Sequence, residues 1–568
     1  MTDREKILSE DYAEFIYPNS YPEEASVTRY NAEIVQPIGL FYSTLYVPLD
    51  KTDAFNFQNY SYFFFPKLYG LMNTVPLDES GITRLRANPI LNLDGRGVIV
   101  GIIDTGIDYT NKIFLDDAGK TRILRIWDQT DAYGNMPESY LKYGSEYTSE
   151  DINRALSSDN PYDIVPERDE NGHGTYLAGI MAGRADASAD FTGCAPAANI
   201  IAVKLKPAKK NLRDYYLVPD DVVCYQENDI IIAANYLRAY ARIYHMPLVI
   251  LIGLGSNQGG HTGQMPLATE LNTITNAFGA AVIVAAGNEG NARHHFAGQL
   301  NPALKNESVE INVGRSTVHS KGFTLEIWVN IPQTFSVGIT SPSGQTTSRL
   351  KPDISGQNRI EFIFENTVAY VDYSLIESTT GDQLIQIRFE NPAEGIWKVN
   401  VYGDNITTGD FNCYLPITQF VGNDTYFLKP DPNITITNPG MASNVITVSG
   451  YNTLNGSFYL NSGRGYSRTG GIKPDFAAPA VNITGPTLAG GFINDSGTSA
   501  AAAITAGATA LFLQWTSTNG RINVTNTREI KSYLIRGAIR NENEAYPNPL
   551  WGYGKLDIYR TFEVLRET

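Results

Sequence analysis

The chain has 568 residues, of which 42% are hydrophobic and 18% are charged, and its net charge at pH 7 is −16. A chain of this length and composition buries a large core and is expected to hold two or three domains. The negative charge excludes nucleic acid and anionic membrane surfaces as predicted partners. Without a run of about 18 apolar residues, no transmembrane helix is predicted.

The amino-terminal residues are charged, and no apolar region follows them, so no secretory signal peptide is predicted. The chain contains three cysteines, an odd number without the spacing of a disulfide framework: Cys194, Cys224 and Cys413. This usage predicts a reducing compartment and no structural disulfides. Residues 38–47 and 55–65 are rich in aromatic and apolar side chains, so the first 75 or so residues are too substantial to be a mere extension.

A continuous apolar run over residues 98–103 ends at Asp104, which predicts a central parallel strand buried on both faces. Similar runs follow at 200–205, 248–254, 280–286 and 445–448. Helices are predicted between them, at 230–244, 267–278 and 499–515. Alternating strands and helices predict an α/β fold with a parallel sheet covered by helices on both faces. Ligands bind beyond the carboxyl ends of such strands, where Asp104 and Asn288 both lie.

Residues 301–440 differ in character. Short segments of alternating polarity, separated by Pro, Gly and Asn turns, occur at 323–329, 359–364, 384–389 and 397–402. This pattern predicts an inserted antiparallel β-sandwich, jelly-roll-like in form. Its expected role is to pack against the rest of the protein and make it rigid, and binding of carbohydrate or a partner stays open as an alternative.

Three short strings carry an aspartate, a histidine and a serine, each among small residues: Asp104-Thr105-Gly106, Gly172-His173-Gly174-Thr175 and Gly497-Thr498-Ser499. A serine hydroxyl is a poor nucleophile unless a base takes its proton, and the base needs a carboxylate to orient it. Taken singly, Asp104 could cap a helix, His173 could be incidental in a glycine-rich turn, and Ser499 could cap the alanine-rich helix that follows. Together and in this order they predict a catalytic triad.

The order Asp, His, Ser and the strings around it resemble those of the subtilases, the subtilisin-like serine peptidases. Further matches are Ala285–Gly290, Lys473-Pro474-Asp475, Ala478-Pro479 and Gly552–Asp557, so the resemblance covers about 98–300 and 440–568. It implies a serine endopeptidase with Asp104, His173 and Ser499 as the triad and Asn288 as an oxyanion donor. One departure is Ala503, followed by Ile504, where subtilases usually carry proline and histidine. Since alanine favours helix, no loss of activity is expected.

The resemblance also implies the substrate contacts. Gly253, Leu254 and Gly255 are similar to the family strand that pairs with the substrate backbone. Glu289, beside Asn288, is expected to favour basic residues at the mouth of the pocket. No metal-binding cluster is predicted, and the adjacent His294 and His295 are expected to lie in a loop. No cofactor is predicted, although calcium, which many subtilases hold, is not excluded.

By resemblance, residues 1–74 are similar to an N-terminal α+β propeptide that is cut off near Asn73–Pro76 and stays bound non-covalently as an inhibitor. The alternative is a permanent N-terminal domain. The expected divisions are therefore the propeptide at 1–74, the first part of the catalytic domain at 75–300, the sandwich at 301–440 and the second part at 441–568. Besides this segment, the expected partner is a protein or peptide substrate.

An unsecreted subtilase with such a propeptide and an inserted sandwich resembles the clostridial germination proteases of the Csp group. Members of that group act in spores on the precursor of a cortex-lytic enzyme, and some are inactive regulators. The expected location is therefore the cytoplasm or spore of a bacterium, or outside it by a non-standard route. An inactive regulator and a serine hydrolase acting on esters stay open as alternatives.

Overall fold

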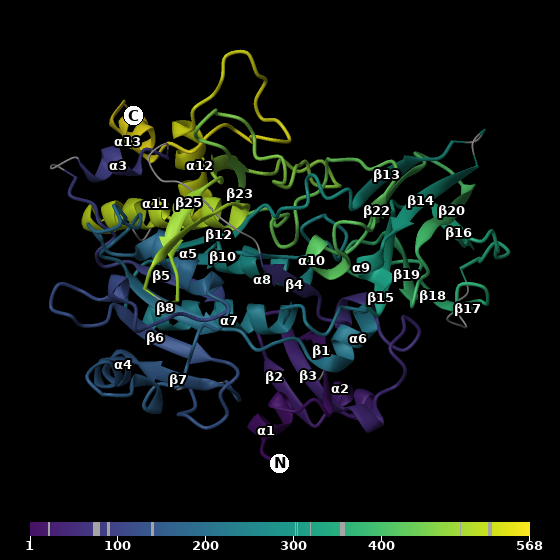
Figure 1. The fold of residues 1–568 in the computed structure, drawn as a ribbon, viewed down its shortest axis with the longest axis horizontal. Coiled ribbons are helices and arrows are strands. Elements are labelled where there is room, and N and C mark those ends of the chain that lie inside the picture. Colours follow the sequence, from purple (N-terminus) through teal and green to yellow (C-terminus); the bar gives the residue numbers. More distant parts are fainter. Residues whose placement is uncertain are drawn as a thin grey trace.

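The structure is a computed structural model. It describes residues 1–20, 23–71, 80–87, 91–137, 141–301, 303, 305–318, 320–352, 358–488, 490–520 and 525–567. An α/β core, an insert built mainly of β-strands and a small N-terminal segment can be followed in Figure 1. The N-terminal segment contacts both of the other parts. Within these ranges, no helix is both long and apolar enough to cross a lipid bilayer.

The core is built on an eight-stranded sheet with strand order β24-β23-β12-β10-β5-β8-β6-β7. All its neighbouring strands are parallel except β6 and β7. In chain order the strands are β5 (Ile99–Asp104), β6 (Ile123–Asp128), β7 (Ser145–Thr148), β8 (Asn199–Lys204), β10 (Leu248–Ile252), β12 (Ala280–Ala285), β23 (Ile446–Tyr451) and β24 (Phe476–Pro479). This sheet confirms the predicted α/β fold. The predicted run 248–254 is broken at Gly253, beyond which β11 (Leu254–Gly255) belongs to another sheet.

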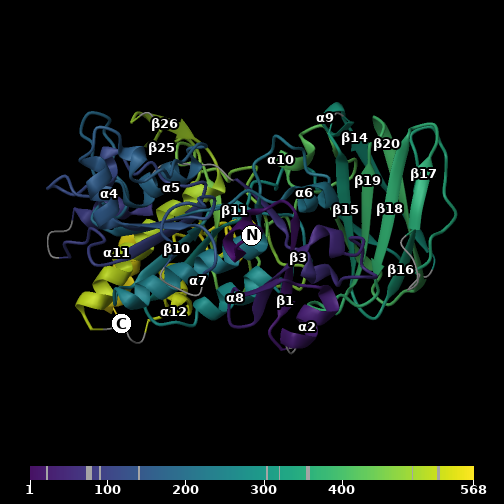
Figure 2. The same cartoon turned by 90° about the horizontal axis from the view of Figure 1, so that it is seen from below.

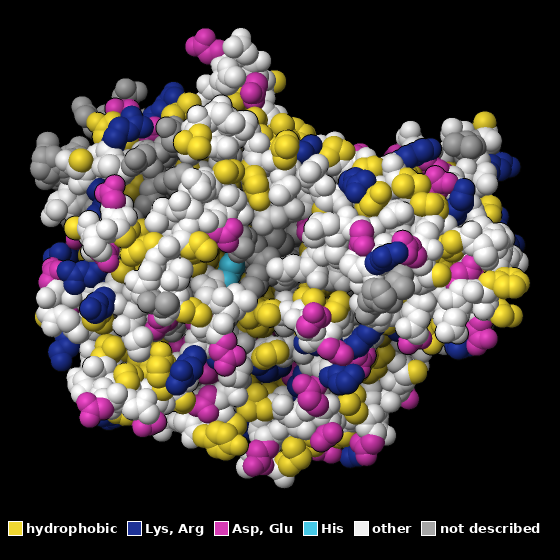
Figure 3. Space-filling model, in the orientation of Figure 1, with side chains coloured by type: hydrophobic (Ala, Val, Ile, Leu, Met, Phe, Trp, Pro, Cys, Tyr) yellow, Lys and Arg dark blue, Asp and Glu magenta, His cyan; other side chains and the backbone are white. Residues whose placement is uncertain are grey.

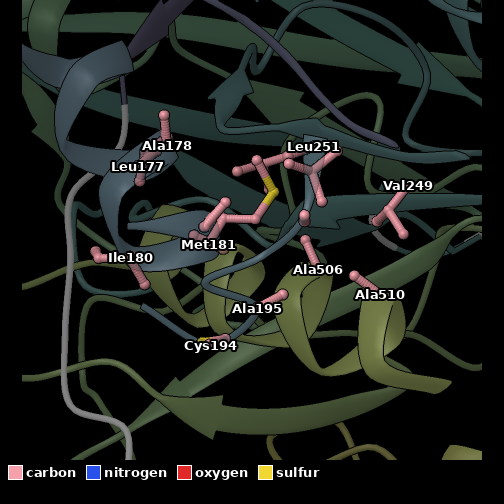
Figure 4. Close-up of a cluster of buried hydrophobic side chains, with 14 of the residues drawn as sticks. Leu177, Ala178, Ile180, Met181, Cys194, Ala195, Val249, Leu251, Ala506 and Ala510 are labelled. Atoms are coloured by element: carbon pink, nitrogen blue, oxygen red, sulfur yellow. The ribbon is translucent and has the colours of Figure 1, made fainter. Parts of the chain in front are cut away.

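Helices cover both faces of the sheet, which is why its central strands are apolar throughout. Residues Val249 and Leu251 of β10 pack against α5 (His173–Ala182) and α11 (Thr498–Thr518), as Figure 4 shows. The alternate residues Ile250 and Ile252 join the hydrophobic cluster of α7 (Glu227–Ile243) and α8 (Pro266–Ile274) on the opposite face. Small side chains such as Ala506 and Ala510 allow α11 to approach the sheet closely.

Further helices and a hairpin surround this core. They are α3 (Ile82–Arg86), α4 (Ser149–Leu156), α6 (Lys210–Tyr216), α12 (Thr527–Gly537), α13 (Ile558–Glu567), β25 (Ile483–Pro486) and β26 (Phe492–Asp495).

The insert is a sandwich of two antiparallel sheets, as predicted, with orders β13-β21-β15-β19-β18-β17 and β16-β20-β14-β22. Figure 2 shows it at one end of the molecule. Its elements are β13 (His295–Gln299), β14 (Asn306–Val313), α9 (Arg315–Val318), β15 (Gly322–Val329), β16 (Thr334–Thr340), β17 (Asn358–Phe362), β18 (Thr367–Ser374), β19 (Gln383–Glu390), β20 (Gly395–Asn405), β21 (Asp410–Tyr414), α10 (Thr418–Val421) and β22 (Tyr426–Phe427). Inward-facing apolar residues of both sheets form one shared core.

The N-terminal segment forms a three-stranded antiparallel sheet of order β1-β3-β2. Its elements are α1 (Asp3–Leu8), β1 (Tyr12–Pro18), α2 (Glu23–Tyr30), β2 (Ile34–Pro37) and β3 (Tyr42–Pro48). One face of the sheet, with Ile16 and Tyr46, joins the cluster of α7 and α8. The other, with Phe15 and Leu45, packs on aromatic residues and on Phe420 of the insert. The segment is therefore wedged between core and insert.

A buried group of charges joins the N-terminal sheet to the core. The carboxylate of Glu14 in β1 lies 2.8 Å from Nζ of Lys206 and 3.2 Å from Nζ of Lys209. Lys206 also lies 2.8 Å from the carboxylate of Asp229. Burial alone would raise the pKa of Glu14, but the two lysines outweigh it and hold this pKa below its usual value. Burial raises the pKa of Asp229 to about 6.

Candidate active site

Asp104 and His173 meet at the carboxyl edge of the sheet. Asp104 is the last residue of β5 and His173 the first of α5, and both side chains are buried. The Nδ1 of His173 lies 2.7 Å from Oδ1 of Asp104, and this oxygen also accepts a 2.8 Å hydrogen bond from the backbone N–H of Thr105. A carboxylate in this position fixes the tautomer and orientation of the imidazole, so that Nε2 is the nitrogen directed to the chemistry.

Asp169, a residue that sequence reasoning missed, ties the two strings together. Its Oδ1 accepts hydrogen bonds from Thr105 Oγ1 at 2.7 Å and from the backbone N–H of Gly172 at 2.8 Å. Its Oδ2 accepts from the backbone N–H and the hydroxyl of Thr175, at 2.9 and 2.7 Å. Asp169 therefore caps the first turn of α5 and holds His173 in register with Asp104. An aspartate four residues before a histidine was the one signal available.

Ser499 is the second residue of α11 and is fully buried. Its hydroxyl makes no hydrogen bond to any of the residues that the structure describes. A Cβ built on Gly253 would lie 3.2 Å from Cβ of Ser499 and 3.4 Å from Cε1 of His173. The structure therefore brings serine and histidine together across Gly253, where any larger residue would occupy the space between them.

Asn288 follows β12 and lies next to the serine string. Its side-chain Oδ1 accepts hydrogen bonds from the backbone N–H and the hydroxyl of Thr498, at 3.1 and 3.2 Å. The Thr498 hydroxyl also accepts a 3.0 Å hydrogen bond from the N–H of Gly287. Because Thr498 occupies the acceptor oxygen, the amide of Asn288 can offer its N–H₂ group to an oxyanion beside Ser499.

The Gly253–Gly255 strand is paired, and its partner comes from the N-terminal part of the chain. In an antiparallel ladder, β11 (Leu254–Gly255) pairs with β4 (Leu68–Leu71), so that Gly255 faces Gly70. The other edge of β4 pairs with β9 (Tyr225–Gln226). A chain segment thus lies in the place expected for a substrate backbone. The expected cut near 73–76 falls outside the described residues, and so does the end of the expected propeptide at 74.

Glu289 lines a cavity of about 360 Å³ beside Asn288, but its carboxylate is engaged within the protein. One oxygen lies 2.7 Å from Nδ1 of His294, and the other accepts a 3.0 Å hydrogen bond from the N–H of Thr418 in the insert. The preference for basic substrate residues stays a prediction. Of the two adjacent histidines, His294 lies in the loop before β13, as predicted. His295 does not, because it is the first residue of β13 and pairs with Tyr414 of β21.

Within the described ranges, no set of three or more His, Cys, Asp or Glu side chains is placed to hold a metal ion. All three cysteines are buried and free, and burial raises the pKa of the Cys224 thiol to about 11. On the face drawn in Figure 3, Lys and Arg side chains are scattered among Asp and Glu.

Gly253→Ala is expected to lower the rate of peptide hydrolysis about 100-fold. The added methyl group would lie 2.7 Å from Leu177 Cδ1 and 3.2 Å from Cβ of Ser499, so Leu177 and the nucleophile would have to shift, and the methyl group would occupy the space beside His173. Steady-state kinetics on a fluorogenic peptide measures the loss. Gly338→Ala is the matched control, because its Cβ would meet its nearest neighbour at 3.5 Å. Full activity of Gly253→Ala would contradict the geometry described for this site.

Comparison with known proteins agrees with this geometry. A model of the subtilase family matches residues 95–365 and 420–554. The solved structure of the CspB protease of Clostridium perfringens has a TM-score of 0.76 and 32% sequence identity to this chain. The match covers 86% of this chain and 99% of that one. This similarity confirms the predicted likeness to the Csp group.

Two curated relatives match over shorter stretches. Thermitase of Thermoactinomyces vulgaris is 25% identical over 265 residues, 46% of this chain and 74% of that protein. The PI-type proteinase of Lactococcus lactis subsp. cremoris is 26% identical over 208 residues, 35% of this chain. The match spans only 10% of the length of that proteinase. The family model matches most of this chain, and the chain forms the core sheet described above. It therefore belongs to the subtilase family of serine peptidases.

Proposed function

We propose that this protein is a serine endopeptidase that hydrolyses peptide bonds by acyl transfer through Asp104, His173 and Ser499. The observation that carries the proposal is the 2.7 Å contact between Asp104 and His173, with Ser499 approaching His173 across Gly253. A serine hydrolase for esters needs no edge strands around its substrate, so the paired strand β4 favours a peptide as the substrate.

In the proposed mechanism, His173 takes the proton of the Ser499 hydroxyl as the oxygen attacks the scissile carbonyl carbon. The carbonyl π bond opens to an oxyanion, which the Asn288 amide and the Ser499 backbone N–H stabilise. His173 then gives the proton to the leaving amine, and the carbon–nitrogen bond breaks. Water, deprotonated by His173, hydrolyses the acyl ester and regenerates Ser499. Asp104 stays ionised and stabilises the imidazolium at each step.

Asn288→Ala is expected to lower kcat about 10²- to 10³-fold with little change in KM, because the oxyanion develops only in the transition state. Asn291→Ala is the control, since Asn291 lines the neighbouring cavity but is exposed. A drop confined to KM would contradict the oxyanion role.

The proposal includes self-processing. Residues 1–74 are proposed to be a propeptide, with the catalytic domain at 75–300 and 441–568 and the sandwich at 301–440. The cut is proposed near 73–76, and the freed segment is proposed to stay bound. Support comes from β4, which fills the groove between β9 and β11, and from the buried contacts of β1 and β3 with the core. N-terminal sequencing of active protein tests this, and an intact Met1 start would overturn it.

The likeness to the CspB protease supports a role as a germination protease that acts on a spore protein, inside a bacterial cell or spore. The competing reading is an inactive regulator on the same fold. A fluorophosphonate probe separates the two: covalent labelling of Ser499 in processed protein supports the peptidase, and an unlabelled Ser499 supports the regulator.

Acid is expected to weaken retention of the freed N-terminal segment. Because bound Glu14 has a lowered pKa, its contribution is complete above the ordinary glutamate pKa of about 4.3 and is lost as the pH falls through its lower, bound value. The pKa of Asp229 is raised to about 6, so protonation of Asp229 does not favour release. Release should therefore begin only when the pH falls far enough to protonate bound Glu14. Size-exclusion chromatography between pH 7 and 3 measures release, and circular dichroism monitors the fold. Equal acid release from a Glu14→Gln variant would contradict the assignment.

A further inference from the structure

We propose that Ile417 and Gln419, contributed by the insert, form a wall of the substrate groove that restricts one substrate position to glycine. This inference rests on the proposed peptidase function and names its substrate class. The restricted position is the one that Gly70 takes in β4. The favoured peptide carries a large apolar residue, a large aromatic residue and then glycine, as in Leu68-Tyr69-Gly70.

The backbone of β4 defines the register of this peptide. Gly70 faces Gly255 on one edge, while Tyr69 faces Tyr225 on the other. When a peptide binds as an added strand between two strand edges, its main-chain hydrogen bonds give affinity, and its side chains, which point alternately to the two faces, give specificity. Residues 68 and 70 therefore share one face of the strand, and residue 69 lies on the opposite face.

No side chain fits at Gly70 without a change in this wall. A Cβ built there would lie 2.3 Å from Oε1 of Gln419 and 2.5 Å from Cδ1 of Ile417, well inside van der Waals contact. The two neighbours differ in how far they can yield. Gln419 lies at the surface, where its side chain is not enclosed by packing. Ile417 is 2% exposed and packs in a hydrophobic cluster with Leu68 and Phe420, so its terminal methyl group sets the restriction.

The wall is fastened to the core on both sides of Ile417. The N–H of Thr418 donates to the Glu289 carboxylate at 3.0 Å, and the side chain of Asn257 donates to the Leu415 carbonyl at 3.2 Å. Glu289 adjoins Asn288, and Asn257 follows β11, so the wall is held by the two loops that flank the groove. A wall fixed in this way cannot retreat as a unit when a larger residue enters.

The other two positions are filled by large side chains. Leu68 and Tyr69 are both fully buried, Leu68 beside Ile417 and Tyr69 in the core cluster that includes Leu254 and Tyr225. Truncation of either side chain would leave an unfilled space, so both substrate positions are expected to favour large side chains. We therefore expect the groove to recognise a glycine that follows two such large residues, and the glycine is more than a flexible spacer.

The first arm of the test uses the full chain and needs no catalysis. Gly70→Ala should lower the thermal unfolding temperature in the otherwise unchanged chain. The Ile417→Val, Gln419→Ala double variant lacks both clashing atoms, so in this background Gly70→Ala should lower the unfolding temperature by less than half as much. Ile339→Val deletes the same methyl group inside the sandwich core, and in this control background the drop caused by Gly70→Ala should be unchanged. An equal drop in unfolding temperature in all three backgrounds would overturn the proposal.

The second arm compares two peptides spanning residues 66–80, one with glycine and one with alanine at position 70. The unchanged protein should cleave the glycine peptide about 10- to 100-fold more efficiently by kcat/KM, and the Ile417→Val, Gln419→Ala variant should lose most of this preference. Equal cleavage of both peptides would overturn the inference alone. No cleavage of either peptide, with Ser499 unlabelled by the fluorophosphonate, would overturn the proposed function and this inference with it. The thermal arm would still report whether the wall excludes alanine.

Discussion

Ser499→Ala is expected to lower peptide hydrolysis by about six orders of magnitude, because no other group can form the acyl ester. The serine hydroxyl makes no hydrogen bond to a described residue, so its loss should leave the fold almost as stable as before. Single-turnover kinetics measures the activity and differential scanning calorimetry the stability. Mass spectrometry should find the chain uncut near 73–76, since self-processing uses the same serine.

Ser496→Ala is the control for this experiment, because Ser496 lines the adjoining cavity three residues before Ser499. It should keep activity within a few-fold and keep its processing. Hydrolysis that persists in the Ser499→Ala protein would show that the activity belongs to another site or to a contaminant. A Ser499→Ala protein that is still cut near 73–76 would show that the cut is made by a different protease.

Glu14→Gln is expected to weaken the hold of the core on the N-terminal segment by about 3–5 kcal/mol. The variant keeps the shape of the side chain but leaves Lys206 and Lys209 buried with one carboxylate, that of Asp229, where they had two. Removing one partner of a buried ion cluster costs more than the cluster contributes, because the remaining charge has no water to solvate it. In processed protein this corresponds to an increase of about 150- to 4,000-fold in Kd, which surface plasmon resonance measures with the segment immobilised.

Glu33→Gln is the matched control. Glu33 also contacts two lysines, Lys6 and Lys51, at 2.8 and 2.9 Å, but all three lie at the surface within the same segment. Exposed ion pairs add little to stability, so this variant should bind as the unchanged segment does. If both variants weaken binding equally, the loss comes from the charge of the segment as a whole. If neither does, the buried cluster is not what retains the segment.

Much of the core could be predicted because its sequence signals are local. Central strands covered on both faces must be apolar along their length, and the runs ending at Asp104 and near Asn288 therefore mark β5 and β12. The break at Gly253 could not be predicted, since the apolar run continues to Leu254 and nothing in it marks where pairing with β5 and β12 gives way to pairing with β4. These contacts join residues far apart in the chain, and apolar patterning does not report them.

Long-range polar contacts at the site were hidden for a similar reason. Asp169 bonds to Thr105, 64 residues away, and nothing periodic surrounds it. The carboxylate of Glu289 looked available for a substrate from sequence alone, because its partner Thr418 belongs to the insert, 129 residues further on. The strings of the triad were visible because small residues cluster around reactive side chains. The groups that hold those strings in place are single residues with ordinary neighbours.

The placement of β4 between two strand edges has a consequence for turnover. A peptide that replaces it forms the same main-chain hydrogen bonds, so the exchange is nearly neutral in backbone energy. The outcome then depends on local concentration. A strand tethered to the docked sheet of β1 and β3 competes at an effective concentration in the millimolar range, and after release of the whole segment it competes only at the concentration of the free segment. A cut near 73–76 leaves β4 joined to that sheet, so an abundant protein substrate wins the groove only when the whole segment dissociates.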